Sequence, residues 1–212
     1  MAETRHHLSE PLLAAYAPGN LPEAFALVVA AHVSLCDECR ARLGAHESAG
    51  GAVLETLAPA EPSESLRDRV LAQLDAPAAG APPAPRRSGI FPAPVMAALK
   101  GRPPRWKMLG GGVRQQILQA DSQGSVRLLY IPPGVAVPDH GHGGLELTLV
   151  LQGAFRDDTG AFGVGDVEIA GPELDHQPVA DLGPPCICLA ATDAPLRFHA
   201  LIPRILQPLF RI

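Results

Sequence analysis

The chain has 212 residues, of which 47% are hydrophobic and 18% charged, with 23 prolines and 21 glycines, so it can bury a core but is unlike an all-helical protein. Residues 1–75 carry eleven acidic and five basic residues, which disfavours nucleic acid as a partner and favours a basic protein. No apolar run is long enough to span a bilayer and no secretory leader is visible, so we expect a cytoplasmic protein without membrane contact.

The first 75 residues contain the signals for four helices. We expect them over residues 9–16, over residues 21–32, from about Cys36 to Leu57, and from Ser63 to about Leu74. The pair Gly50-Gly51 weakens the third helix. In the fourth, Leu66, Val70, Leu71 and Leu74 form an apolar stripe, which either faces a core or becomes a surface for another protein.

A metal-site pattern lies between the second and third predicted helices. Cys36 and Cys39 are separated by two residues, and His32 lies one helical turn before Cys36. A tetrahedral zinc ion needs a fourth ligand, for which we select His7, with His6 as the alternative. A thioredoxin-like thiol pair and two ordinary buried cysteines are the competing interpretations.

Residues 76–105 form a Pro/Ala-rich linker, within which Pro94 to Lys100 can form one short helix. From residue 106 to residue 212 the pattern becomes one of short strands with frequent turns, typical of a β-sandwich or barrel. Leu145, Leu147, Leu149 and Leu151 alternate with more polar residues, and this leucine face belongs either to the core or to an interface between barrels.

A second metal-site pattern lies in the strand region. His140, His142 and Glu146 share a face of an extended strand if Gly143-Gly144 keeps the register, and the later His176 can complete the site. Two or three imidazoles with one carboxylate suit zinc, iron, manganese or nickel. The competing interpretation is two polar loop histidines and an unrelated surface glutamate.

Cys186 and Cys188 are two residues apart, so on a strand their thiols share a face, which we place near His140 and His142. They are a candidate redox pair, candidate extra metal ligands, or small buried apolar residues.

The run Gly134-x5-His140-x-His142-x3-Glu146-x6-Gly153 matches the first cupin motif, and Gly165-Asp166 and His176 match parts of the second, although Ala170-Gly171-Pro172 replaces the usual Pro-x-Gly. Together with His7, His32, Cys36 and Cys39, these residues make the chain resemble the ChrR type of zinc-binding anti-sigma factor, especially over residues 5–42, 134–157 and 186–212.

This resemblance implies an α + β multidomain protein: a small all-α zinc-binding bundle in residues 1–75, followed by an all-β cupin (jelly-roll barrel) domain in residues 106–212. It implies that the bundle binds and inhibits an extracytoplasmic-function sigma factor. It also implies that the cupin-like domain releases the sigma factor under singlet oxygen or related oxidative stress. The implied cofactors are zinc in the bundle and a second divalent metal in the cupin domain, for which we expect zinc.

The main alternative is a cupin metalloenzyme, a dioxygenase or isomerase, with an accessory zinc domain. We do not favour it, because no further acid–base pair is evident and the remaining carboxylates, such as Asp157 and Asp158, lie mostly in predicted turns. A scaffold whose metals only stabilise the fold is a weaker alternative.

Overall fold

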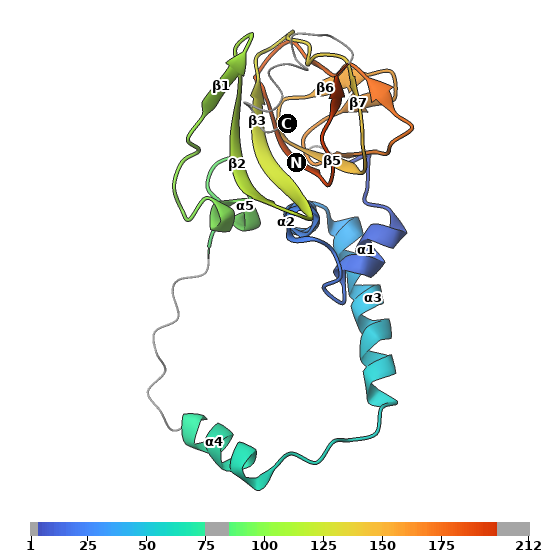
Figure 1. The fold of residues 1–212 in the computed structure, drawn as a ribbon, viewed down its shortest axis with the longest axis vertical. Helices are drawn as coiled ribbons and strands as arrows, with labels where there is room; N and C mark the ends of the chain where they lie inside the picture. Colours follow the sequence, from blue (N-terminus) through green and yellow to red (C-terminus); the bar gives the residue numbers. More distant parts are fainter. Residues whose placement is uncertain (1–3, 75–84, 199–212) are drawn as a thin grey trace.

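The structure is a computed structural model that describes residues 4–74 and 85–198. A helical region is followed by a β-rich region, as predicted; most of the helices gather at one end of the strands, and one helix is set apart from them (Figure 1). Residues 76–84 of the predicted linker and residues 199–212 of the predicted barrel lie outside the described residues, so the domain limits drawn from the sequence stay predictions.

The helices begin close to the positions that the capping residues predict. Pro11 lies in the first turn of the first helix, where its missing amide hydrogen costs nothing. Gly50-Gly51 lies inside the third helix without ending it. The bounds within the described residues are α1 Glu10–Tyr16, α2 Glu23–Val33, α3 Asp37–Glu55, α4 Glu64–Leu74 and α5 Ala93–Ala98.

The strands pair antiparallel in three sheets, whose orders are β1-β2-β3-β11-β5-β8, β10-β6-β7 and β12-β4-β9. Residues from all three sheets line one internal cavity, so the strands enclose a barrel. Their bounds are β1 Lys107–Gly110, β2 Val113–Asp121, β3 Gly124–Ile131, β4 His140–Gly141, β5 Glu146–Gln152, β6 Phe155–Asp157, β7 Gly160–Phe162, β8 Val167–Ala170, β9 Asp175–His176, β10 Val179–Ala180, β11 Cys186–Thr192 and β12 Arg197–Phe198.

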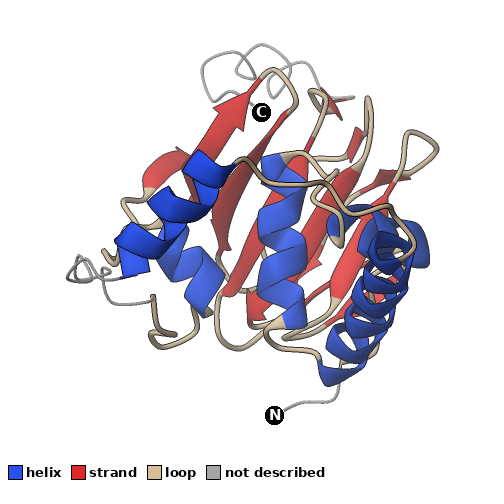
Figure 2. Ribbon diagram, turned by 90° about the horizontal axis from the view of Figure 1, so that it is seen from below, coloured by secondary structure: helices blue, strands red, loops and turns tan. Residues whose placement is uncertain are grey.

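Helix α2 joins the helical region to the barrel. Its sequence is apolar nearly all round, a pattern that requires burial on more than one side. The helix contacts α1, α3 and α5 and also lies on β3, β5 and β11 of the large sheet. Figure 2 shows the molecule from the side on which the helices lie. Phe25 and Val28 therefore belong to the same buried cluster as Leu128 and Leu189 of the sheet.

The leucine face of β5 is part of this shared core. Leu147, Leu149 and Leu151 are buried in the cluster that contains α2. On the opposite face of the strand, Glu146 and Thr148 line the barrel cavity. The alternation therefore separates a helix-covered outer face from a barrel interior, which decides between the two interpretations of the leucines in favour of the core.

The end of the predicted linker is packed against the helices. Helix α5 lies where a short helix was predicted, contacts α2, and buries Val95 completely. Leu99, directly after it, is also buried. Residues 93–99 thus add to the core, whereas the sequence composition alone describes them as spacer.

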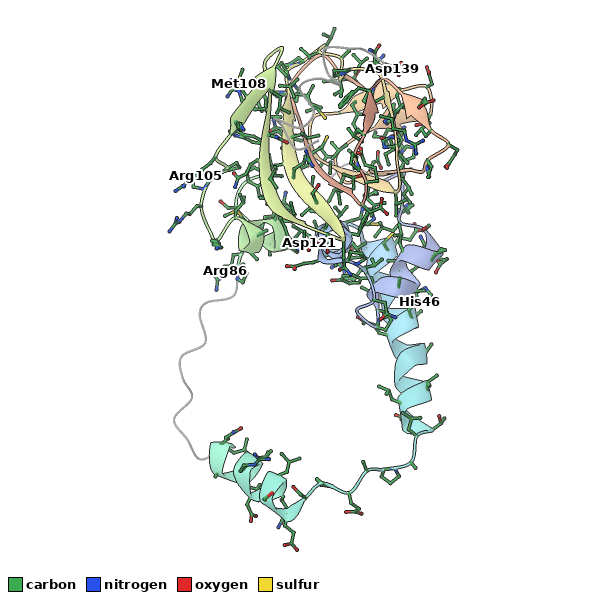
Figure 3. All side chains as sticks on the ribbon, viewed as in Figure 1. His46, Arg86, Arg105, Met108, Asp121 and Asp139 are labelled. Atoms are coloured by element: carbon green, nitrogen blue, oxygen red, sulfur yellow. The ribbon has the colours of Figure 1, made fainter. Side chains whose placement is uncertain are left out.

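Helix α4 and the distal end of α3 have the opposite character. No residue of α4 is buried, and the buried residues of α3 are Cys39 and Leu43 near its beginning. The side chains of both segments stand away from the rest of the described chain (Figure 3). Among the described residues, no helix combines the length and the apolar character that crossing a membrane requires.

Candidate metal centres

The four predicted ligands in the helical region converge. His7 precedes α1, His32 lies in the last turn of α2, and Cys36 and Cys39 lie at the start of α3. One ligand atom from each lies within 4.8 Å of all the others. The Nδ1 atom of His7 is 3.3 Å from the Cys36 sulfur and 3.7 Å from the Cys39 sulfur. Three helix ends thus bring together residues that are up to 32 positions apart.

These donors fit a tetrahedral zinc ion. Bond lengths of about 2.3 Å for Zn–S and about 2.0 Å for Zn–N place sulfur and nitrogen ligands roughly 3.5 Å apart, close to the distances from His7. His32 is fully buried, and neither of its ring nitrogens has a hydrogen-bond partner among the described residues. Burial lowers the pKa of His32 to about 4, so the ring is neutral and able to bind a metal. A bound ion would satisfy one of these unpaired nitrogens.

Two residues behind the ligands were missed by the sequence analysis. The carboxylate of Glu38 lies 3.3 Å from Nε2 of His7, the ring nitrogen that faces away from the cysteines. Arg42 donates to the Cys39 sulfur at 3.8 Å and to the Leu8 carbonyl at 3.0 Å. Such outer partners orient a ligating imidazole and balance thiolate charge. Their spacing of four residues on α3 was the signal that could have revealed them.

His6, the alternative ligand, lies outside this cluster. Its ring packs on Phe162 of the barrel with centroids 4.4 Å apart, and its Nδ1 lies 3.4 Å from the Asp166 carboxylate. The geometry therefore favours His7 over His6 as the ligand.

A second cluster lies in the barrel and contains three of the four residues predicted there. Ligand atoms of His140, His142 and His176 lie within 4.8 Å of one another. The pairing of β4 with β9 sets His140 directly opposite His176. The Nε2 atoms of His142 and His176 are 3.2 Å apart, and the other nitrogen of His142 has no hydrogen-bond partner in the described part of the chain. Burial lowers the pKa of His142 to about 4, which leaves a neutral donor for a metal.

Glu146 lies beside this triad but not within its tight group. Its carboxylate is 3.8 Å from Nδ1 of His142 and accepts a hydrogen bond from Thr148 at 3.0 Å. Burial raises the pKa of Glu146. Glu146 is therefore not one of the residues whose ligand atoms all lie within 4.8 Å of one another.

Two further carboxylates contact His176 from behind. Its Nδ1 lies 2.6 Å from the Asp157 carboxylate and 3.3 Å from the Glu168 carboxylate. Burial by itself lowers the pKa of His176, but Glu168 and Asp157 outweigh it and raise this pKa to about 9. Burial raises the pKa of Glu168 to about 7. Asp157 does hold the predicted turn through Thr159 and Gly160, but the expectation that no further acid–base pair accompanies the histidines is wrong, because Asp157 and Glu168 both contact His176.

An apolar cavity of about 390 Å³ adjoins the barrel cluster. Leu129, Ile131 and Phe155 line it, and His140 and His176 reach its wall. A cavity of this size holds a small molecule rather than a macromolecular segment of any length.

The cysteine pair of β11 faces the barrel interior. The sulfurs of Cys186 and Cys188 are 3.4 Å apart, both residues are buried free thiols, and Cys188 lines the cavity with His140 and His176. The hydrogen bond from Cys186, together with burial, raises the pKa of Cys188 well above its usual value. The shared face is confirmed, whereas the redox role stays a prediction.

Three matches with known proteins bear on the identity of this chain. The family of the ChrR cupin-like domain matches residues 97–194. The anti-sigma-E factor ChrR of Cereibacter sphaeroides is 58% identical over 210 residues, which cover 98% of this chain and 99% of that protein. A crystal structure of Rhodobacter sphaeroides SigE in complex with the anti-sigma ChrR matches with a TM-score of 0.80 and 56% identity, covering 90% of this chain and 99% of the matched one.

Proposed function

The chain belongs to the ChrR family of anti-sigma factors, and from this premise we propose that it binds and inhibits an extracytoplasmic-function sigma factor in the cytoplasm. The helical residues 1–75 make the contact, and the barrel controls release under singlet oxygen or related oxidative stress. Anti-sigma factors are regulators, so family membership favours this function over the cupin-enzyme alternative.

The observation that carries the proposal is the apolar surface of α4 and the distal end of α3. Of the eleven exposed large hydrophobic residues in the described chain, seven lie between residues 53 and 74. Large apolar surface of this kind marks a protein-binding site. It is built of Val53, Leu54, Leu57, Leu66, Val70, Leu71 and Leu74.

Two further facts identify the partner class. Residues 1–75 carry six more acidic than basic residues, which suits a basic protein through complementary charge. The matched Rhodobacter sphaeroides ChrR was crystallised with SigE. A sigma factor is therefore the occupant we propose for the exposed apolar surface.

A matched pair of substitutions on α4 tests this surface. Val70→Asp places a charge in the apolar stripe, and Ala72→Asp places the same charge on the opposite, polar side of the same helix. We expect Val70→Asp to weaken binding of the cognate sigma factor by at least about tenfold, and Ala72→Asp to leave it within about threefold. Equal affinities for the two variants in a titration with purified sigma factor would exclude α4 as the contact.

We further propose that His7, His32, Cys36 and Cys39 bind zinc, and that His140, His142, His176 and Glu146 bind a second divalent metal, for which zinc is our expectation. The unpaired ring nitrogens of buried His32 and buried His142 support one site each. The zinc chemistry would be structural in the helical region, holding three helix ends together.

The two cysteine pairs provide a control for each other. The double variant Cys36→Ala/Cys39→Ala should lose one metal per chain by elemental analysis and should no longer inhibit sigma-dependent transcription. The double variant Cys186→Ala/Cys188→Ala should keep the helical metal and the inhibition. If the first variant still inhibits transcription, zinc has no role in holding the sigma factor.

The proposed role of the barrel rests on its oxidisable groups, since the imidazoles of His140 and His176 and the thiol of Cys188 line one cavity. A His140→Ala variant should keep inhibition but lose induction of a sigma-dependent promoter when a photosensitiser generates singlet oxygen. Normal induction in this variant would show that the barrel metal is not needed to release the sigma factor.

A further inference from the structure

The chain just before His7 is bound to the barrel. The backbone amides of Arg5 and His6 donate to one oxygen of Asp166, at 2.6 Å and 2.9 Å. The Val167 amide in turn donates to the His6 carbonyl at 3.2 Å. Strand β8 is the last strand of the large sheet and pairs with β5 on one side only. The N-terminal segment lies against its other, otherwise unpaired side.

Asp166 is built to make this contact. It is 4% exposed, and its second oxygen accepts from the Gly163 amide at 2.8 Å, which holds the carboxylate in place. Burial tends to raise the pKa of Asp166, but backbone donors from His6, Gly163 and Arg5 lower it, so the group is an anion with strong hydrogen bonds.

The adjacent turn is shaped for close approach. Gly165 has φ +96, and a Cβ atom there would lie 2.9 Å from the Thr4 hydroxyl. A glycine therefore serves both the turn and the passage of the N-terminal segment.

Residues 166–168, at the start of β8, reach both candidate metal centres. Asp166 holds the backbone of His6, and the next residue, His7, has its Nδ1 in the helical cluster. Two residues after Asp166, the Glu168 carboxylate lies 3.3 Å from Nδ1 of His176 in the barrel cluster. Residues 166–168 thus hold the backbone beside one candidate ligand, His7, and contact another candidate ligand, His176, directly.

We propose that Asp166 is a positioning residue of the helical metal centre, which fixes the chain that presents His7, and that residues 166–168 thereby couple this centre to the one in the barrel. The inference rests on the proposed metal binding at His7, His32, Cys36 and Cys39, and deepens the proposed function by naming a path between sensing and binding regions.

Arg5 offers a matched pair of variants, because Arg5→Pro removes the amide donor whereas Arg5→Ala keeps it, and both remove the guanidinium. In the full-length protein loaded with zinc, we expect Arg5→Pro to release helical zinc to a chelator about tenfold faster than wild type, and Arg5→Ala to stay within about twofold. Asp166→Ala should behave as Arg5→Pro does. Hydrogen exchange of the His6 and Val167 amides should accelerate in the same two variants and not in Arg5→Ala.

Coupling is tested by combining changes. His142→Ala disables the barrel centre, and we expect it to change the rate of helical zinc release in the wild-type background but not with Asp166→Ala already present. If the double variant changes the zinc-release rate by the product of the factors for His142→Ala and Asp166→Ala, the two centres are not coupled through Asp166. If Arg5→Pro and Arg5→Ala release zinc at equal rates, the positioning role is wrong. A wild-type protein that binds no zinc at the helical cluster would instead overturn the proposed function.

Discussion

Helices α2 and α4 are each 11 residues long, begin with a glutamate and carry apolar side chains, yet they lie in opposite surroundings. Six residues of α2 are buried, and it packs between other helices and the large sheet. No residue of α4 is buried. Helix α2 therefore holds the two regions of this chain together, while α4 leaves its apolar side exposed.

The largest expected effect is for a charge in α2. Val29 is 0% exposed, so Val29→Asp buries an unpaired carboxylate or forces the helix off the sheet. We expect a loss of about 4 kcal/mol or more in the free energy of unfolding of the full chain, measured by urea denaturation. A loss below about 1 kcal/mol would contradict the placement of α2 in a core shared with the barrel.

The sheet side of that core gives the next effect. Leu149 is 0% exposed on the face of β5 that α2 covers. Leu149→Ala should cost about 3 kcal/mol of stability and leave the oligomeric state unchanged, because the leucine face is core. The matched change Leu74→Ala, at 75% exposure in α4, should cost less than about 0.5 kcal/mol. A change in sedimentation with Leu149→Ala but none in stability would instead place Leu149 in an interface.

Helix α3 is intermediate, since it is buried near its start and exposed beyond it. A Cβ atom at Gly50 or Gly51 would meet nothing within 4 Å. Replacing either glycine by alanine should stabilise the distal half of α3 by about 0.5–1 kcal/mol, through lower backbone entropy in the unfolded chain. Hydrogen exchange of residues 50–57 would slow by a few fold, and unchanged exchange would mean that this half is not helical in solution.

The smallest effect is expected in α4. Val70→Asp is the same chemical change as Val29→Asp, but Val70 is 48% exposed. We therefore expect the free energy of unfolding of this variant to lie within about 0.5 kcal/mol of that of the wild type. Urea denaturation and the sigma-factor titration of this variant, taken together, should show a loss of affinity without a loss of stability. A stability loss comparable to that of Val29→Asp would mean that α4 packs against its own chain.

Local patterns predicted much of this protein, because they depend on near neighbours. Helices α1 and α4 start after Ser9 and Ser63, where capping residues predict them, although only the Ser63 hydroxyl accepts a capping hydrogen bond, from the Leu66 amide. The alternation of β5 follows from strand geometry. His32, Cys36 and Cys39 converge as their spacing predicts, and His7, selected as the fourth ligand before His6, joins them. Near the barrel, three histidines meet, while Glu146 stands slightly aside.

The residues that surround these ligands were not predictable in the same way. Asp157 and Glu168 contact His176, and Glu38 contacts His7. The sequence pattern around a carboxylate is the same whether or not a histidine from another element faces it. Only the pairing of strands and helix ends brings them together.

By itself, the sequence determined the order of helices and strands, the two sets of candidate ligands and the apolar character of α2 and α4, because periodicity and spacing are local properties of a chain. The tertiary structure alone decided that α2 packs on the leucine face of β5, while α4 is left uncovered by the described residues. It alone placed Asp166 on the amide of Arg5, 161 residues away. Contacts of such separation depend on how whole layers pack, and that packing has no counterpart in the spacing of neighbouring residues.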